Sequence, residues 1–288
     1  DGDPFAALKE ADKALEGAYG FCVMFKDHPG EIYCIRNASP LVASHTEDGS
    51  FIASDMVALL KYTKDYFVVP EEHIVVMKAD SITLYTMDGG VEEPKMLHVD
   101  WDTTAAQKGG YDFFMQKEIY DQPEALHNTI MPRIHNGHAD FSADNISDDI
   151  FKGVNRVIVT ACGTAWHAGL VGRHLIEAMI RIPVTVELAS EFRYMNPILD
   201  EHTLVVVITQ SGETADSLAA LRLANERGAK TISIVNVKGS SIARESDYVL
   251  YTHAGPEIAV ASTKAFSVQC AGMYLIELKL AEVNNLMT

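Results

Sequence analysis

From Arg156 onward, runs of β-branched and other apolar residues alternate with segments of helical pattern. The expected strands are 156–160, 184–188, 203–208, 231–235 and 249–252, and the expected helices are 165–180, 215–227, 241–246 and 263–283. Continuously apolar strands separated by helices are typical of a parallel sheet with helices on both faces. In such sheets, ligands bind at the carboxyl ends of the strands. The pattern therefore predicts a three-layer α/β/α domain with a five-stranded parallel sheet.

The segment from Val205 to Thr214, VVVITQSGET, carries the most informative chemistry of this domain. Its apolar run stops at small hydroxyl residues and Gly212, and the helical segment 215–227 follows directly. The first N–H groups of a helix lack partners within the helix, and together with the helix dipole they attract anions. No Lys follows the glycine, as a nucleotide-type P-loop would require. The segment indicates a cradle for one phosphate monoester on a sugar, and an ordinary capped turn is the alternative.

Polar residues also follow two other strands of the predicted sheet, at 161–165 (ACGTA) and 255–264 (GPEIAVASTK). If the sheet is parallel, these loops open on the same edge as 209–214. A dinucleotide fold needs G-x-G-x-x-G after its first strand, but Gly163 is followed by a second glycine only at Gly169. Converging loops with hydroxyl groups therefore favour a small polyol phosphate.

The first third of the chain has the pattern of a β-rich domain, with turn signals such as Glu47-Asp48-Gly49 between short apolar runs. The expected strands are 20–25, 32–36, 51–54, 73–78 and 82–87, the last in a hairpin with 91–93, and helices are expected at 4–15 and 56–62. A boundary is expected at 107–110, followed by helices at 111–120 and 124–130. The acidic segment 140–149 is expected to be a loop or a solvated helix.

Charge and cysteine content restrict the partners of the chain. The net charge of −17 disfavours nucleic acid, because phosphate backbones are bound through an excess of Lys and Arg. No apolar run reaches the roughly 20 residues needed to cross a bilayer, so no membrane partner is expected. The four cysteines are far apart and give no zinc pattern, which suits the reducing cytoplasm.

Several single residues have two interpretations. Cys162 is either a reactive thiol beside the anion site or a small buried residue at a strand end. Lys264 either contacts the ligand or is a cation on the first turn of a helix. Glu213 is expected to point away from the anion and to stabilise a helix start. His135 and His138 flank Asn-Gly and are interpreted as a turn, so no metal site is assigned.

The chain resembles one enzyme family along nearly its whole length. The runs CGTAWHAG, VELASEFRY, ITQSGETADSLAALR, NVKGSSIARESD and EIAVASTKAF resemble the first sugar-isomerase (SIS) domain of the glutamine–fructose-6-phosphate aminotransferase family. GAYGF, ASPLV and FIASDMVALL resemble the later part of its glutaminase domain, and YDFFMQKEIYDQP resembles the joining segment. The resemblance implies a partial α+β glutaminase sandwich of the Ntn type over 1–110, a linker with the N-terminal helices of the isomerase domain over 111–150, and the first SIS domain over 151–288.

The resemblance also implies roles for individual residues. Those matching the family's phosphate loop are Thr209, Gln210, Ser211 and Thr214. Those matching its contacts to the sugar hydroxyls are Thr164, Ser262 and, through its backbone, Val260. Asp55 matches the acid that binds the α-amino group of glutamine, and Ala165 replaces a serine of the family.

The implied activity is the amination of fructose 6-phosphate with ammonia from glutamine and its isomerisation to glucosamine 6-phosphate. No metal or organic cofactor is implied, and the full-length enzyme is expected to be a cytoplasmic homodimer. The family's N-terminal cysteine nucleophile and second SIS domain have no match here. The chain is therefore expected to be an internal piece that lacks both catalytic centres and is inactive alone, so no catalytic residue is assigned.

Two alternatives stay open. SIS domains also occur in non-catalytic regulators that bind a sugar phosphate, although the glutaminase-like first half argues against this class. A related amine-forming enzyme with another sugar phosphate is the third possibility, because the loops do not separate hexose isomers.

Overall fold

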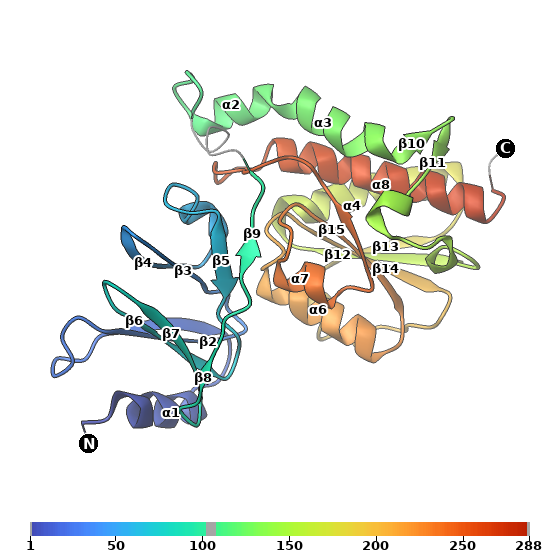
Figure 1. The fold of residues 1–288 in the computed structure, drawn as a ribbon. Helices are drawn as coiled ribbons and strands as arrows, with labels where there is room; N and C mark the ends of the chain where they lie inside the picture. Colours follow the sequence, from blue (N-terminus) through green and yellow to red (C-terminus); the bar gives the residue numbers. More distant parts are fainter. Residues whose placement is uncertain (1, 102–107, 287–288) are drawn as a thin grey trace. The chain divides into compact units, whose positions relative to one another are not determined.

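The computed structural model describes residues 2–101 and 108–286. Contacts divide the chain into two compact units, Asp1–Ala106 and Gln107–Thr288. Figure 1 shows the elements of both units, and each unit is described separately below.

The first unit is built on two antiparallel sheets. One has the strand order β1-β2-β6-β7-β8 and the other β4-β3-β5-β9. The strands of the first sheet are β1 (Tyr19–Val23), β2 (Ile32–Asn37), β6 (His73–Met77), β7 (Ile82–Thr86) and β8 (Val91–Glu92). Those of the second are β3 (Val42–Thr46), β4 (Gly49–Ala53), β5 (Asp65–Val68) and β9 (Leu97–His98). Every predicted strand of this region is present.

Strand periodicity divides the apolar residues of the first sheet between its two faces. Cys34 and Val75 face a core that the second sheet completes with Ala43 and Phe67, so the two sheets pack against each other. Ile35 and Ile74 face the opposite side, where they pack against Leu8 of α1 (Pro4–Ala14). The helix begins at Asp3, whose carboxylate accepts a hydrogen bond from the Phe5 N–H at 3.0 Å.

The structure differs from the prediction at four places in this unit. Strands β3, β5 and β9 were not expected, because their short runs mix apolar with polar residues. The helix expected at 56–62 is wrong, since only the 3₁₀ turn η1 (Met56–Ala58) forms there, and further turns follow it. Residues 56, 59 and 60 are buried at helical spacing, but the backbone closes short bonds, such as Tyr62 N–H to Leu59 O at 2.8 Å.

The second unit contains the predicted five-stranded parallel sheet, in the order β13-β12-β14-β15-β16. The strands are β12 (Arg156–Ala161), β13 (Val184–Leu188), β14 (Thr203–Thr209), β15 (Lys230–Val235) and β16 (Tyr248–Tyr251). The main helices are α4 (Gly163–Met179), α6 (Ala215–Glu226) and α8 (Lys264–Val283), with the short α5 (Ala189–Phe192) and α7 (Ser241–Glu245).

Helices cover both faces of this sheet (Figure 1). Val206 of β14 packs into one core with residues of α4 and α8, such as Ile176 and Ile276. Its neighbours Val205 and Val207 point the other way and pack with α6 and α7. The continuous apolar strand is therefore explained by burial on both faces, as predicted.

The segment before β12 packs onto the same body. Helices α2 (Phe114–Tyr120) and α3 (Gln122–Ile130) come first, and Ala125 of α3 packs against Val268 of α8. The expectation of a solvated segment at 140–149 is wrong in part. Phe141 (1% exposed) and Ile146 belong to the sheet core, and 3₁₀ turns at Ser142–Asp144 and Asp148–Ile150 lie beside them. These two apolar residues anchor the acidic run in the core, and Asp144 also pairs with the buried Arg133 at 2.6 Å.

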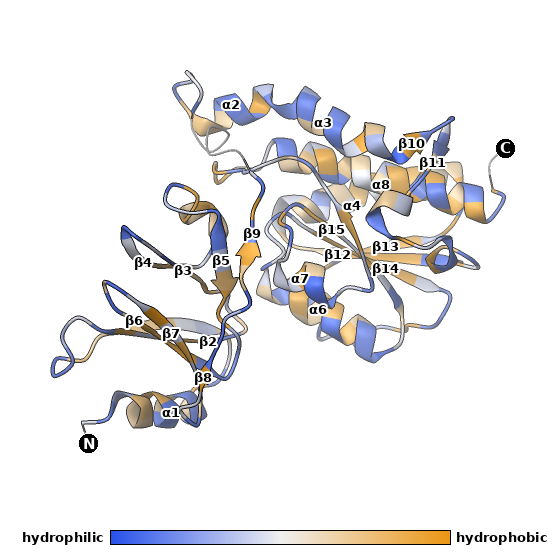
Figure 2. Cartoon of the chain, viewed as in Figure 1, coloured by the Kyte–Doolittle hydropathy of each residue, from blue (hydrophilic) through white to orange (hydrophobic). Residues whose placement is uncertain are grey.

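Figure 2 shows the strands of the parallel sheet as largely hydrophobic, whereas the helices carry both hydrophilic and hydrophobic residues. None of the helices in the described ranges combines the length and the apolar composition that a membrane span requires.

We predict that Gly172→Ala destabilises the second unit, because α4 and α8 touch at this glycine. A Cβ at position 172 would lie 2.4 Å from the Met273 Cε and 2.9 Å from its Cβ. Alanine favours a helix by about 0.5–1 kcal/mol over glycine, but overpacking costs about 1–3 kcal/mol. The expected net loss in the free energy of unfolding is about 1–2 kcal/mol, measured by urea denaturation.

The double variant Gly172→Ala/Met273→Ala is the control, because it makes room for the added methyl group. Its loss should be smaller than the sum of the two single losses. Additive losses would show that the two residues are not in steric conflict.

Candidate functional site

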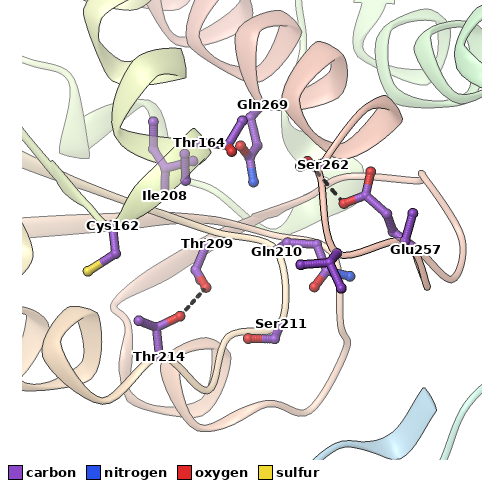
Figure 3. Close-up of a pocket in the computed structure, with 13 residues that line it drawn as sticks. Cys162, Thr164, Ile208, Thr209, Gln210, Ser211, Thr214, Glu257, Ser262 and Gln269 are labelled. Carbon is purple, nitrogen blue, oxygen red and sulfur yellow. Dashed lines mark hydrogen bonds between the residues drawn. The ribbon is translucent and has the colours of Figure 1, made fainter. Parts of the chain in front are cut away.

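A hollow of about 270 Å³ opens at the carboxyl ends of β12 and β14. It is lined by residues of the loops 162–165, 208–214 and 257–262, and by Gln269 of α8 (Figure 3). These are the three loops that the sequence places on one edge of the sheet. The parallel topology brings them together, because β12 and β14 are hydrogen-bonded neighbours that end at the same level.

Seven of the predicted site residues line this hollow, and the eighth does not. The seven are Thr164, Thr209, Gln210, Ser211, Thr214, Val260 and Ser262. The Val260 side chain is fully exposed, so the predicted contact concerns its backbone. Asp55 belongs to the first unit, where its carboxylate accepts a hydrogen bond from the Val57 N–H at 2.7 Å and caps η1. A ligand contact of any of the eight stays a prediction.

The loop after β14 is held in shape by its own hydroxyl groups. Thr209 is buried, and its Oγ1 accepts a hydrogen bond from the Gly212 N–H at 3.1 Å. The same oxygen lies 3.4 Å from the Oγ1 of Thr214, as the dashed line in Figure 3 marks. The Ser211 Oγ accepts from the Glu213 N–H at 3.2 Å. These bonds curl the loop around the start of α6.

Gly212 is required at its position for two reasons. Its φ of +71° lies in the left-handed region, and a Cβ there would lie 1.9 Å from the Ser240 Oγ. The missing side chain lets α7 approach the loop closely, and the Gly212 carbonyl accepts a hydrogen bond from the Ile242 N–H at 3.0 Å. Glu213 is not among the lining residues, and its carboxylate accepts from the Ser241 N–H at 2.8 Å. Glu213 therefore stabilises the start of α7, not of α6.

Two helix N-termini point at the hollow. The helix α4 begins at Gly163, two residues earlier than predicted, and Thr164 therefore lies in its first turn. The helix α6 begins directly after Thr214. No side chain caps either start within the described ranges, which leaves backbone N–H groups for a ligand. None of the lining residues is cationic. Helix dipoles and hydroxyl donors thus provide the attraction for an anion.

The third loop is positioned by two glutamates that the sequence analysis did not single out. Glu257 accepts hydrogen bonds from the Thr263 N–H at 2.9 Å and the Ala265 N–H at 3.1 Å, and so caps α8. Its carboxylate also accepts a hydrogen bond from the Ser262 hydroxyl at 3.0 Å, which leaves the Ser262 oxygen as an acceptor for a ligand (Figure 3). Glu118 of α2, 2% exposed, accepts from the N–H groups of Ile258 and Ala259 at 2.6 and 3.1 Å.

Asn236, which follows β15, ties the second loop to the third. Its backbone N–H donates to the Gln210 carbonyl at 3.2 Å. Its side-chain amide donates to the Gly255 carbonyl at 2.7 Å and accepts from the Ala254 N–H at 3.0 Å. This buried amide fixes the spacing between two walls of the hollow.

The structure decides between the two interpretations of Lys264, and both interpretations of Cys162, which is partly exposed, stay open. Lys264 is 2% exposed and is not among the lining residues, and its Nζ lies 3.0 Å from the Asp121 Oδ2. It is therefore a paired cation on the first turn of α8. Cys162 lines the hollow, and its sulfur accepts a hydrogen bond from the Ser217 hydroxyl at 3.9 Å.

His135 and His138 face each other across the hairpin of β10 (Ile134–His135) and β11 (His138–Ala139), which confirms the predicted turn. Across residues 2–101 and 108–286, no group of three or more His, Cys, Asp or Glu side chains could hold a metal ion.

We predict that Asp121→Asn destabilises the protein in a pH-dependent way. Burial raises the pKa of the Asp121 carboxyl, but Lys117 and Lys264 outweigh this effect and hold the pKa below its usual value of 3.8. Because the folded pKa is the lower one, the stabilisation is present above the unfolded pKa and is lost as the pH falls through the folded pKa. The variant should lose about 1–3 kcal/mol at pH 7 in urea denaturation.

The difference between wild type and Asp121→Asn should shrink below pH 4. Asp149→Asn is the matched control, because Asp149 pairs with Lys152 on the surface, where both side chains are exposed, and it should have little effect. A difference that is the same at pH 7 and pH 3 would contradict the assignment.

The chain is similar to known proteins over nearly its whole length. Residues 150–276 match the model of the SIS domain family. The glutamine–fructose-6-phosphate aminotransferase (isomerizing) of Clostridium tetani is 47% identical over 98% of this chain and 46% of its own length. The enzyme of the same name from Streptomyces coelicolor is 48% identical over 93% of this chain and 44% of its own length.

A solved structure is also similar to this chain. It is the C-terminal domain of glucosamine-fructose-6-phosphate aminotransferase from Francisella tularensis, which is 40% identical with a TM-score of 0.61, over 63% of this chain and 52% of that one. The chain spans about half the length of the enzymes that it matches. The chain is therefore similar to one part of the glutamine–fructose-6-phosphate aminotransferases, and its residues 150–276 match the SIS domain family.

Proposed function

We propose that the chain contributes the sugar-phosphate site of a glutamine–fructose-6-phosphate aminotransferase. The observation that carries the proposal is the convergence of three hydroxyl-bearing loops and two helix N-termini on one hollow without a cationic lining residue. Such a site suits the phosphate monoester of a polar, uncharged molecule such as a sugar. The names of the relatives indicate that this ester is fructose 6-phosphate.

The phosphate is assigned to the loop after β14. Gln210, Ser211 and Thr214 lie there beside the start of α6, where the helix dipole is favourable for a dianion. The sugar hydroxyl groups then face Thr164, Ser262 and the backbone of Val260. Ser262 accepts from a sugar hydroxyl group, because its own hydroxyl donates its hydrogen bond to Glu257.

The overall reaction combines fructose 6-phosphate and ammonia to give glucosamine 6-phosphate and water. Ammonia adds to the C2 carbonyl of the open sugar, water leaves, and protons move between C1 and C2 with general acid–base help. This chain binds and orients the sugar in the proposal, and no catalytic residue is assigned to it. Fixing one end of the sugar through its phosphate places C1 and C2 at a defined distance from the loop.

For the first unit we propose part of an Ntn-type glutaminase domain over residues 1–110, joined to the SIS domain over 151–288 by 111–150. The two facing antiparallel sheets support this proposal. Asp55 would bind the α-amino group of glutamine, because a carboxylate is the natural partner of an ammonium group. A homodimeric, cytoplasmic enzyme is part of the same proposal.

Calorimetric titration of the chain with fructose 6-phosphate tests the site directly. We expect saturable heat at millimolar ligand, and inorganic phosphate should compete because it occupies the same loop. No heat at these concentrations would reject the proposal. A protein that binds the sugar phosphate but, as the complete enzyme, never forms glucosamine 6-phosphate would instead be a non-catalytic SIS regulator.

We predict that Ser211→Ala weakens the binding of fructose 6-phosphate. The variant removes one hydroxyl donor from the phosphate, a loss of about 1–2 kcal/mol, which corresponds to about 5- to 30-fold in Kd. Ser142→Ala is the control, because Ser142 is exposed and lies outside the hollow. An unchanged Kd for Ser211→Ala would mean that the phosphate lies elsewhere.

A further inference from the structure

Gln269 brings a polar side chain to the inner wall of the hollow. It lies in the second turn of α8, is 3% exposed and is one of the residues that line the hollow. Its Oε1 is buried and has no hydrogen-bond partner among residues 2–101 and 108–286. Figure 3 shows the side chain entering the hollow from the α8 side.

A buried carbonyl oxygen without a partner is unfavourable in a folded protein, and most buried polar atoms have one. The neighbouring residues of α8 do not supply a partner, because Val268 and Ala271 are buried apolar residues. The open side of the amide is the hollow itself. A molecule bound in the hollow is therefore the natural partner.

The chemistry of the amide decides which part of a ligand it meets. The unpaired Oε1 needs a donor, and phosphate oxygens, which are acceptors, do not supply one, although they can accept from the amide Nε2. A hydroxyl group both donates and accepts, so it satisfies the amide in either orientation. The phosphate is already assigned to the loop of Ser211 and Thr214, on another wall of the hollow (Figure 3). Gln269 therefore faces the sugar carbon chain.

We propose that Gln269 is a ligand-contacting residue that hydrogen-bonds a hydroxyl group on the carbon chain of the bound phosphate ester. The contact selects polyhydroxylated phosphates over phosphate alone, because only a hydroxyl group donates to the buried Oε1. The inference rests on the proposed sugar-phosphate site. It adds a residue from α8, a wall that none of the three loops supplies.

Gln269→Met tests the inference, since it keeps the length of the side chain and removes both polar atoms. In calorimetry of the whole chain, the variant should bind fructose 6-phosphate about tenfold more weakly than wild type. Its affinity for inorganic phosphate should stay within about twofold, since no amide contact reaches the phosphate. Ser211→Ala should weaken both ligands, which separates the two ends of the site.

Thr160→Val is the matched control. The Thr160 Oγ1 is also buried with no partner in the described part of the chain, but Thr160 does not line the hollow. This variant should bind both ligands as wild type does. If Gln269→Met does not fold, Gln269→Asn, which withdraws the amide by one methylene group, should also lose affinity for fructose 6-phosphate only.

The outcomes are distinct for the two proposals. Wild type that fails to bind fructose 6-phosphate rejects the sugar-phosphate site. Wild type that binds, with an unchanged Kd for Gln269→Met, rejects the role of Gln269 and leaves the site intact. Equal weakening of fructose 6-phosphate and inorganic phosphate would also reject it, because that result indicates a general distortion of the hollow.

Discussion

Parallel pairing of β12 with β14 is the constraint on which the site depends. Residues 156–161 pair in register with 203–208, so both strands end at one edge of the sheet. Each strand is followed within a few residues by a helix whose N-terminus returns over that edge. The parallel pairing of these two strands therefore places two loops, two helix N-termini and several hydroxyl groups around the same hollow.

A site that attracts an anion with neutral groups needs its donors held in advance, because each contact is weak and a mobile loop would lose the gain to entropy. The structure meets this need from outside the hollow. Gly212 allows the close approach of α7, Asn236 joins two loops, and Glu118 and Glu257 hold the third. Stability of the fold and geometry of the site thus share the same hydrogen bonds.

The larger elements of the second unit were predictable because their signals are local. A buried strand such as β14 is apolar throughout, and a Ser/Thr/Gly cluster at its end is typical of an anion loop. Weaker patterns misled the prediction. The helix expected at 56–62 has helical spacing of apolar residues but only one 3₁₀ turn, and the acidic run around Phe141 and Ile146 is anchored in the core.

The parallel sheet and its three polar loops can be predicted from the local pattern of residues. The distant side chains that hold these loops or line the hollow follow only from the packing of separate elements. Glu118 accepts a hydrogen bond from the N–H of Ile258, which lies 140 residues later in the chain. Gln269 is one of the polar residues in a largely apolar helix, and only the packing of that helix on the sheet orients its side chain toward the hollow. Periodicity reports what a residue does within its own helix or strand, whereas these contacts exist only after separate elements have packed.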